Sequence, residues 1–192
     1  DIRKAFDSVR WEYILDPLQR RGFPSKFREW ITALLKTSSS RILLNGIPGN
    51  AIKHGKGFRQ GDPLSPLLFV IAIDPLQQVL NVATCCGILH KIRGRGTCFR
   101  TSLYADDAAV FVKPLKEDVL NLATILDCFG RATGLCTNFQ KSSVVPIRCG
   151  SLNLDEILHE LPASRASFPV KYLGLPLSVW QLKRADCQYL ED

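Results

Sequence analysis

Two adjacent aspartates, Asp106 and Asp107, lie between two short runs that are typical of β-strands, residues 101–104 and 108–112. The spacing predicts a tight antiparallel hairpin. Side chains alternate across a strand, so two neighbouring carboxylates would normally point to opposite faces. A tight turn relaxes that alternation and presents a carboxylate at the rim of the sheet. The pair is also typical of an ordinary turn, because Asp side chains hydrogen-bond to nearby backbone.

The size and composition of the chain predict one soluble globular domain. Its 192 residues are enough for a buried core, and 46% hydrophobic and 22% charged residues are ordinary values. The longest apolar run, residues 67–73, is too short to cross a membrane, and the charged start argues against a signal peptide. We therefore expect no membrane partner. Because the sequence contains no methionine, we expect it to be part of a longer protein.

Seven cysteines form an odd set without any Cys-x-x-Cys spacing. This pattern argues against a zinc site and against a disulfide framework. It favours a reducing, intracellular compartment and leaves nucleus and cytoplasm equally open.

The formal net charge of the chain is +7. The basic residues gather in residues 53–59 and 91–95 and at Arg100, with glycines among them. Clustered basic residues mixed with glycine favour a polyanionic partner such as nucleic acid. A merely basic surface is the alternative.

Apolar periodicity predicts two helices at the start of the chain. The first is expected over residues 8–22, where Pro17 should introduce a kink or a break. The second begins at Pro24, and one of its faces is expected to pack in the core. That face comprises Phe27, Trp30, Ile31, Leu34 and Leu35.

Hairpins and helices alternate in the rest of the chain. Residues 38–58 predict a hairpin with an elongated tip around residues 45–46, an Asn-Gly pair. A helix from Ser65, interrupted at residues 74–75, and an amphipathic helix over residues 116–131 follow. Shorter elements are expected at residues 143–147 (strand), 154–161 (helix) and 170–177 (strand pair). The fold class is therefore α+β, an antiparallel sheet backed by helices.

A third acidic position, Asp1, is expected at the end of a strand and forms a candidate set with Asp106 and Asp107. Two-metal phosphoryl transfer needs carboxylates that bridge two divalent ions roughly 3.5–4 Å apart. Mg²⁺ prefers oxygen ligands and keeps some of its water, so two or three carboxylates together with substrate phosphates suffice.

Five stretches of the chain resemble the motifs of reverse transcriptases. Residues 1–7, 59–66 and 104–107 look like motifs A, B and C, and residues 134–142 and 172–175 are similar to motifs D and E. The motifs follow one another in the family's order over nearly the whole chain. Their sequences most resemble non-LTR (LINE-type) retrotransposons, particularly plant ones, while group II intron enzymes are a weaker match.

The resemblance implies roles at the active site. Asp1 and Asp106 would be the main ligands of two Mg²⁺ ions, for which Mn²⁺ is the alternative, and Asp107 would support them. Phe6 would be the steric gate that excludes a 2′-hydroxyl and so selects deoxynucleotides. The other substrate-binding positions would be Gln60, Gly61 and Tyr104, the first two along the nucleotide and template.

The resemblance also implies roles around this centre, each with a simpler structural competitor. Lys141 would protonate the pyrophosphate leaving group, or would be a surface lysine. The primer grip would be Tyr172, Leu173, Gly174 and Leu175, although Gly174 is also what a turn requires. Phe6 competes as a core residue. We expect Asp62 only to shape a turn and Asp7 to cap the following helix.

The resemblance implies a reverse transcriptase domain over residues 1–181, made of the palm and part of the fingers, and the start of a thumb at residues 182–192. An RNA template, a DNA primer and deoxynucleoside triphosphates would be its partners. Endonuclease, thumb and remaining fingers would belong to a larger polyprotein, and we expect a piece without them to be inactive by itself. The alternative is a non-catalytic nucleic-acid-binding remnant of a decayed or domesticated element.

Overall fold

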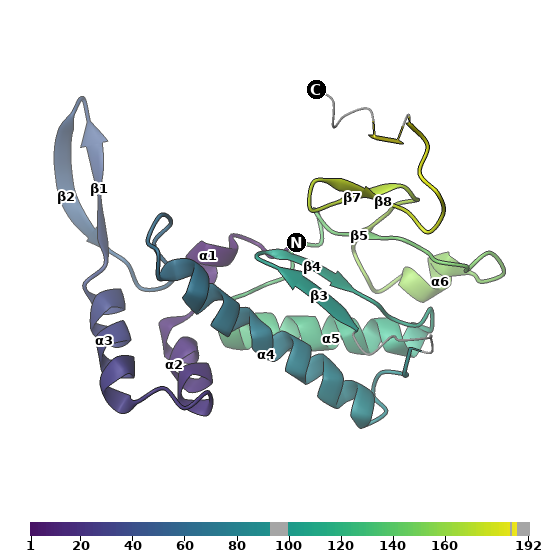
Figure 1. Ribbon diagram of the computed structural model, residues 1–192, viewed down its shortest axis with the longest axis horizontal. Coiled ribbons are helices and arrows are strands. Elements are labelled where there is room, and N and C mark those ends of the chain that lie inside the picture. The colour runs from purple at the N-terminus through teal and green to yellow at the C-terminus, as the bar shows by residue number, and fades with distance from the viewer. Residues whose placement is uncertain (93–99, 185, 188–192) are drawn as a thin grey trace.

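The computed structural model describes residues 1–92, 100–184 and 186–187. Its helices are α1 (Ala5–Ser8), α2 (Trp11–Arg20), α3 (Ser25–Lys36), α4 (Ser65–Cys85), α5 (Lys116–Thr133) and α6 (Leu154–Leu158). Its strands are β1 (Ser39–Leu44), β2 (Ile47–Lys53), β3 (Thr101–Tyr104), β4 (Asp107–Val110), β5 (Ser143–Val144), β6 (Ser164–Arg165), β7 (Val170–Tyr172) and β8 (Leu175–Leu177). The mixed α and β content is confirmed (Figure 1). Arg93, Arg95 and most of the expected thumb segment lie outside the described residues.

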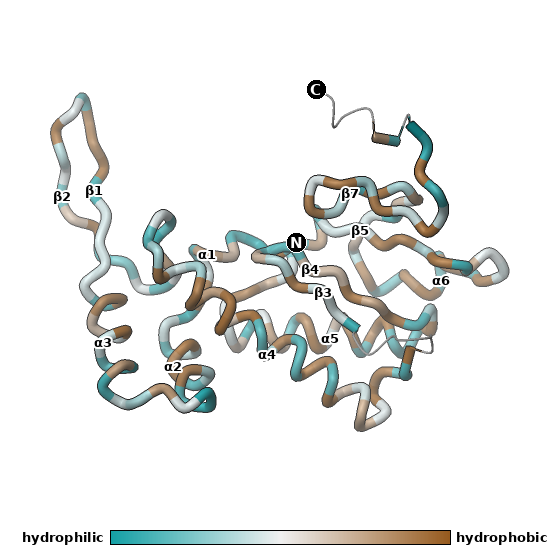
Figure 2. The backbone as a smooth tube through the Cα atoms, viewed as in Figure 1, coloured by the Kyte–Doolittle hydropathy of each residue, from teal (hydrophilic) through white to brown (hydrophobic). Residues whose placement is uncertain are grey.

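The core lies where α2, α4 and α5 pack together, with the β3–β4 hairpin alongside (Figure 1). Figure 2 shows apolar segments recurring along these helices. Their buried side chains include Ile14, Leu18, Phe69, Leu80, Leu122 and Phe129. Burying one such side chain stabilises the folded state by about 1.5–3 kcal/mol. The Tyr13 hydroxyl donates a hydrogen bond to the Ala72 carbonyl at 3.0 Å, which ties α2 to α4, and burial raises the pKa of this phenol.

Two helices contain a proline and continue through it. Pro17 lies inside α2, and Pro75 lies inside α4, so the expected interruption at residues 74–75 is wrong. Proline removes a backbone donor and normally kinks or breaks a helix. Here Pro17 itself is buried, and Ile73 and Leu76 on either side of Pro75 are buried in the core, so packing offsets the lost hydrogen bond.

α4 meets the length and composition criterion for a membrane span among the described residues. The core helix of a globular protein meets the same criterion. Because α4 buries Leu68, Phe69 and Leu76 in the core, the result is weak evidence for a span.

The strands form four separate two-stranded pairs in the described part of the chain, so the expected single antiparallel sheet is wrong. Three pairs are antiparallel hairpins, and β5–β6 is parallel. Residues 1–3 lie beside the turn of the β3–β4 hairpin, but they are too few to add a third strand to it. Ile2 forms an antiparallel bridge to Thr137, and two residues later Lys4 adopts a φ of +47° and α1 begins.

The β1–β2 hairpin confirms the Asn-Gly signal. Asn45 and Gly46 have φ values of +49° and +82°, and both are positive, as a type I′ turn requires. Leu44 pairs with Ile47, so the tip is tighter than expected. Figure 1 shows this hairpin projecting away from the helices.

α3 presents only part of its expected core face to the core. Ile31 is buried, whereas Trp30 and Leu34 are 57% and 60% exposed. The expectation is therefore wrong for these two side chains, because they lie on the side of α3 that the other described elements leave uncovered. Lys26 Nζ lies 5.6 Å from the centroid of the Trp30 ring, an arrangement typical of an exposed cation–π contact.

Gly134 ends α5 and allows the chain to pass close to residues 8–10. Its φ is +88°, and a Cβ placed there would lie 2.1 Å from the Ser8 carbonyl oxygen. The Arg10 amide donates to the Thr133 carbonyl at 2.8 Å, which holds the two segments together. Because of this close approach, the segment after α5 lies beside the first residues of the chain.

Replacing Gly134 with Ala should therefore destabilise the chain by more than about 2 kcal/mol. A positive φ alone costs about 1–2 kcal/mol for an L-residue, and the clash with Ser8 adds to it. Gly22→Ala is a matched control, since Gly22 has a φ of +80° and a Cβ added there would meet open space. Urea unfolding measures the free energy of unfolding of both variants. Equal losses of this free energy would contradict the close approach of Gly134 to Ser8.

Candidate active site

The first residues of the chain lie extended between the β3–β4 turn and the segment after α5. The Ile2 amide donates to the Asp106 carbonyl at 3.1 Å on one side. On the other side the Asn138 amide donates to the Asp1 carbonyl at 2.9 Å, and the Arg3 amide donates to the Cys136 carbonyl at 2.8 Å. Asp1 and Asp106 therefore occupy neighbouring positions although they are far apart in the sequence. Figure 1 shows the N-terminus beside this hairpin.

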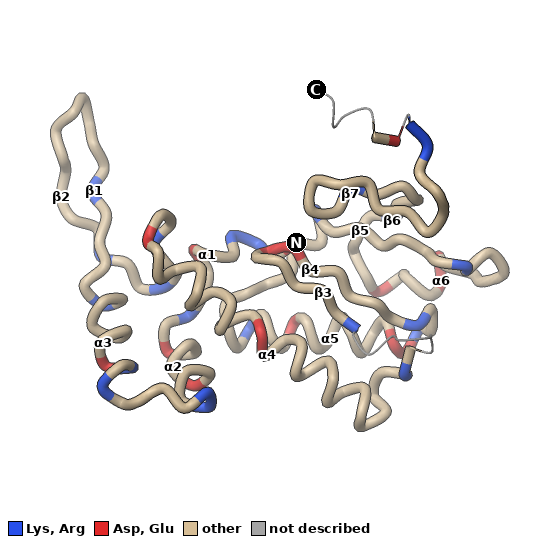
Figure 3. Tube along the Cα trace, in the orientation of Figure 1, with Lys and Arg blue, Asp and Glu red and all other residues tan. Residues whose placement is uncertain are grey.

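The β3–β4 hairpin carries the two adjacent aspartates as expected. Tyr104 pairs with Asp107, and the turn between them contains Ala105, whose φ is +50°, and Asp106. Asp106, Asp107 and Tyr104 are exposed, and Asp1 is half-buried. Acidic segments meet at this rim in Figure 3.

The rim offers carboxylate oxygens, the donors that Mg²⁺ and Mn²⁺ prefer. Among the described residues, no three His, Cys, Asp or Glu side chains converge closely enough to bind an ion by themselves. The described residues therefore contain no closed protein cage for an ion, and Asp1, Asp106 and Asp107 supply only the carboxylate oxygens.

Phe6 lies on α1 and is half-buried. Its ring stacks on that of Phe69 from α4, with centroids 4.7 Å apart and planes inclined by 17°. The Phe58 amide donates to the Phe6 carbonyl at 2.6 Å, which fixes the backbone beneath the ring. The side chain thus packs against the core and remains partly exposed.

The loop before α4 brings Gln60 against α1. Gln60 Nε2 donates to Asp7 Oδ1 at 3.4 Å, and Gly61 adopts a φ of +87° with open space around it. Asp62 Oδ1 accepts from the Leu64 amide at 2.9 Å, so the expected turn is confirmed. The expected cap by Asp7 is wrong: the N-cap of α2 is Arg10, which makes no side-chain cap, and Asp7 lies within α1.

The segment after α5 contains Lys141 and supports Asp1. Lys141 is exposed, and its amide donates to the Asn138 carbonyl at 3.1 Å. Ser142 Oγ donates to the same carbonyl at 2.7 Å. Because the Asn138 amide holds the Asp1 carbonyl, this loop is part of the scaffold of the site. Sequence reasoning missed that role, since a backbone contact leaves no signature in residue type.

The β7–β8 hairpin confirms the strand pair expected at residues 170–177. Leu173 and Gly174 form its turn with φ values of +52° and +83°, and Leu173 and Leu175 are exposed. The Tyr172 hydroxyl donates to Ser102 Oγ on β3 at 3.1 Å. This contact places β7 beside the strand that leads to the aspartates, and nothing in the sequence pointed to Ser102.

An acidic rim on a hairpin turn, backed by helices and flanked by a second hairpin, defines a candidate nucleotidyl-transfer centre. The chain belongs to the reverse transcriptase (RNA-dependent DNA polymerase) family, whose family model matches residues 1–177. The match covers all five motifs.

Several similar proteins are polyproteins of retrotransposable elements. A retrovirus-related Pol polyprotein from a type-1 retrotransposable element R2 of Nasonia vitripennis is 43% identical over 74 residues, 38% of this chain. One from Popillia japonica is 28% identical over 93% of the chain, and one from the type-2 element R2DM of Drosophila melanogaster is 26% identical over all of it. The chain spans 7%, 30% and 18% of the lengths of these three relatives.

These relatives confirm the expected relationship to non-LTR retrotransposons. The expectation of a plant element is not borne out by these three relatives.

The contact between Tyr172 and Ser102 is testable by a double-mutant cycle of Tyr172→Phe and Ser102→Ala. We expect a coupling free energy of about 0.5–1 kcal/mol, because each change removes one partner of the same hydrogen bond. Urea unfolding of the two single variants and the double variant measures it. Additive losses would mean that β7 and β3 do not interact through these hydroxyls.

Proposed function

We propose that this chain supplies the polymerising site of an RNA-directed DNA polymerase, which adds deoxynucleotides to a primer 3′-hydroxyl along an RNA template. The observation that carries the proposal is the hydrogen bond from the Ile2 amide to the Asp106 carbonyl, because it sets Asp1 beside the hairpin turn. Two Mg²⁺ or Mn²⁺ ions bound there would activate the hydroxyl and neutralise the leaving pyrophosphate. Membership of the family over residues 1–177 supports the same reaction class.

The three carboxylates would divide the work of holding the ions. Asp1 and Asp106 would be the main ligands, and Asp107 would support them from the first position of β4. The exposure of Asp106 and Asp107 at the rim would leave room for the triphosphate. The peptide group that follows Asp1 is hydrogen-bonded through both its amide and its carbonyl, so the backbone of Asp1 would be held before substrate arrives. Such preorganisation is the main source of catalysis in phosphoryl transfer.

The substrate would lie over α1 and the loop before α4. The Phe6 ring, seated on Phe69, would clash with a 2′-hydroxyl and so reject ribonucleotides. Gln60 and Gly61 would lie along the nucleotide and template, where the open space around Gly61 permits close approach. Tyr104 would contribute from the rim.

The flanking segments would handle the leaving group and the primer. Lys141 would protonate the pyrophosphate, and the primer grip would be the β7–β8 turn, residues 172–175. In this proposal residues 1–181 form the palm and part of the fingers, and a thumb begins at residue 182. The protein would act inside the cell within a larger polyprotein. A remnant that binds nucleic acid without turnover is the alternative, and primer extension separates the two.

Asp106→Asn should lower primer extension by the protein that contains this chain at least about a hundredfold, because it weakens a metal ligand at the reacting phosphate. Binding of the primer–template should persist. Asp127→Asn is the matched control: Asp127 is an exposed residue of α5 paired with Arg131, and the change should leave extension unaltered. Equal rates in the Asp106 variant and its parent would refute the assignment, and an inactive parent that binds RNA would favour the remnant.

Phe6→Val should admit ribonucleotides at least about tenfold more readily, since a smaller side chain relieves the clash with the 2′-hydroxyl. Phe23→Leu is the matched control, because it removes one ring of another stacked aromatic pair, Phe23 on Phe27, and leaves both Phe6 and Phe69 in place. It should lower stability by about 1–2 kcal/mol without changing sugar selection. The measurement is the ratio of ribonucleotide to deoxynucleotide incorporation, and the same ratio in parent and Phe6→Val would identify Phe6 as a packing residue only.

A further inference from the structure

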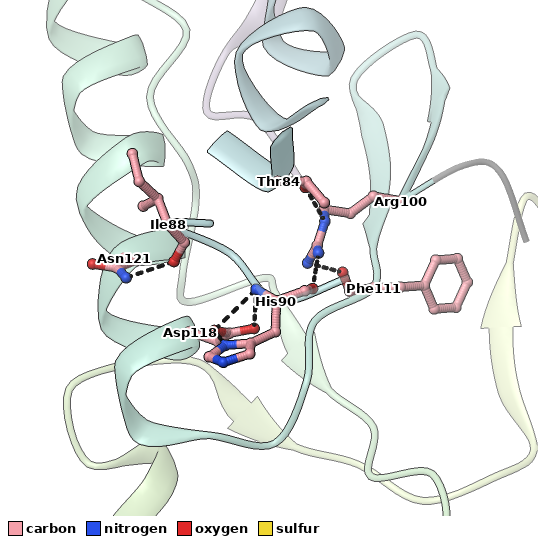
Figure 4. Close-up of polar contacts among 7 residues, drawn as sticks. All are labelled: Thr84, Ile88, His90, Arg100, Phe111, Asp118 and Asn121. Atoms are coloured by element: carbon pink, nitrogen blue, oxygen red, sulfur yellow. Dashed lines mark hydrogen bonds and ion pairs between the residues drawn. The ribbon is translucent and has the colours of Figure 1, made fainter. Parts of the chain in front are cut away.

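Two buried ionisable side chains lie away from the acidic rim, at the base of the β3–β4 hairpin. Arg100, which directly precedes β3, is 5% exposed, and Asp118, in the first turn of α5, is fully buried. Figure 4 shows both within one polar cluster that also contains His90. Buried charges are costly unless they are paired and hydrogen-bonded, so such a cluster calls for an explanation.

The Arg100 guanidinium joins three separate parts of the chain. Nε donates to Thr84 Oγ1 at 3.0 Å, and Nη1 donates to the Phe111 carbonyl at 3.0 Å. Nη2 donates to the His90 carbonyl. Its contacts therefore link the end of α4, the connection that follows it and the residue after β4 (Figure 4). Burial lowers the pKa of this guanidinium, and the Asp118 carboxylate opposes that shift.

Asp118 holds the same connection from the side of α5. Its carboxylate accepts from the His90 amide at 3.1 Å, and His90 Nδ1 lies 2.7 Å from Oδ1. Because a carboxylate only accepts, the ring nitrogen is the donor. Asn121, one turn further along α5, donates to the Ile88 carbonyl at 2.8 Å. Arg100 therefore binds the carbonyl of His90, whereas Asp118 binds its amide and its ring, so His90 links the two buried side chains.

The hairpin needs such support because an isolated two-stranded hairpin is marginally stable in water. Its tip is held by the Ile2 amide on the Asp106 carbonyl. Its base ends at the hydrogen bond from the Phe111 amide to the Arg100 carbonyl at 2.8 Å. Arg100 therefore closes the ladder with its backbone and anchors it with its side chain.

We propose that Arg100 and Asp118, joined through His90, are positioning residues that fix the direction of the β3–β4 hairpin and thereby place Asp106 and Asp107. The catalytic part of this inference rests on the proposed polymerase function. The structural part concerns the chain itself and does not require activity. A cluster that only contributed overall stability would affect the whole core, whereas a positioning cluster affects the hairpin selectively.

Hydrogen exchange on the 192-residue chain tests the structural part. Arg100→Lys keeps the charge but cannot span three acceptors in a planar fork. We expect the Phe111 amide at the base and the Ile2 amide at the tip to exchange at least about tenfold faster, and the core amides of Ile14 and Leu18 to be unchanged. Arg131→Lys, at an exposed ion pair on α5, is the control and should change none of them.

Asp118 provides a second pair of variants. Asp118→Asn retains an acceptor for the His90 amide, so it should preserve protection at Phe111 and Ile2 to within about threefold. Asp118→Leu leaves both His90 donors unpaired and should abolish that protection. The proposal is overturned if Asp118→Asn and Asp118→Leu change the exchange rates alike, or if the Phe111 amide responds without the Ile2 amide. It is also overturned if the amides of Ile14 and Leu18 respond to the same extent.

Kinetics test the catalytic part in the protein that contains this chain. Where extension depends on Asp106, Arg100→Lys should lower kcat about tenfold or more and leave the KM for deoxynucleotides unchanged, because a displaced carboxylate impairs the chemical step rather than binding. An unchanged kcat would overturn the positioning role. If extension does not depend on Asp106, the proposed function fails, while the exchange experiment still decides whether the cluster holds the hairpin.

Discussion

A backbone hydrogen bond from the Ile2 amide to the Asp106 carbonyl joins the start of the chain to the turn of the β3–β4 hairpin. It is reinforced on the opposite side of the same segment, where the Asn138 amide holds the Asp1 carbonyl. Through these two bonds the first two residues meet two segments that each lie more than a hundred residues further along the chain. Without them Asp1 would be an exposed carboxylate unrelated to the other two, and the rim would lose its third acidic group.

The strands reach this arrangement as separate hairpins rather than as a wide sheet, so their positions depend on side-chain contacts. Tyr172 ties the β7–β8 hairpin to Ser102, and Arg100 ties the base of the β3–β4 hairpin to Thr84 and His90. Helices α2, α4 and α5 supply the apolar core under them. The fold thus separates its roles: the helices provide stability, and polar contacts orient the hairpins.

Local signals in the sequence predicted much of this fold. The Asn-Gly pair at residues 45–46, the amphipathic pattern of α5 and the glycine that ends it determine conformations through short-range sterics, which a sequence expresses directly. The same reasoning was wrong where packing decides. Pro75 remains inside α4, and Trp30 stays exposed although its spacing resembled a core position. Both outcomes depend on which neighbouring elements cover a face, and periodicity alone does not contain that information.

The sequence by itself determined the chemistry available to this protein: the three aspartates, their order along the chain, and a family resemblance that the match over residues 1–177 confirmed. The tertiary structure alone decided which backbone groups hold Asp1, how Tyr172 reaches Ser102, and why Arg100 and Asp118 are buried. The physical reason is that residue types specify donors, acceptors and charges, whereas long-range contacts depend on where the folded backbone places them.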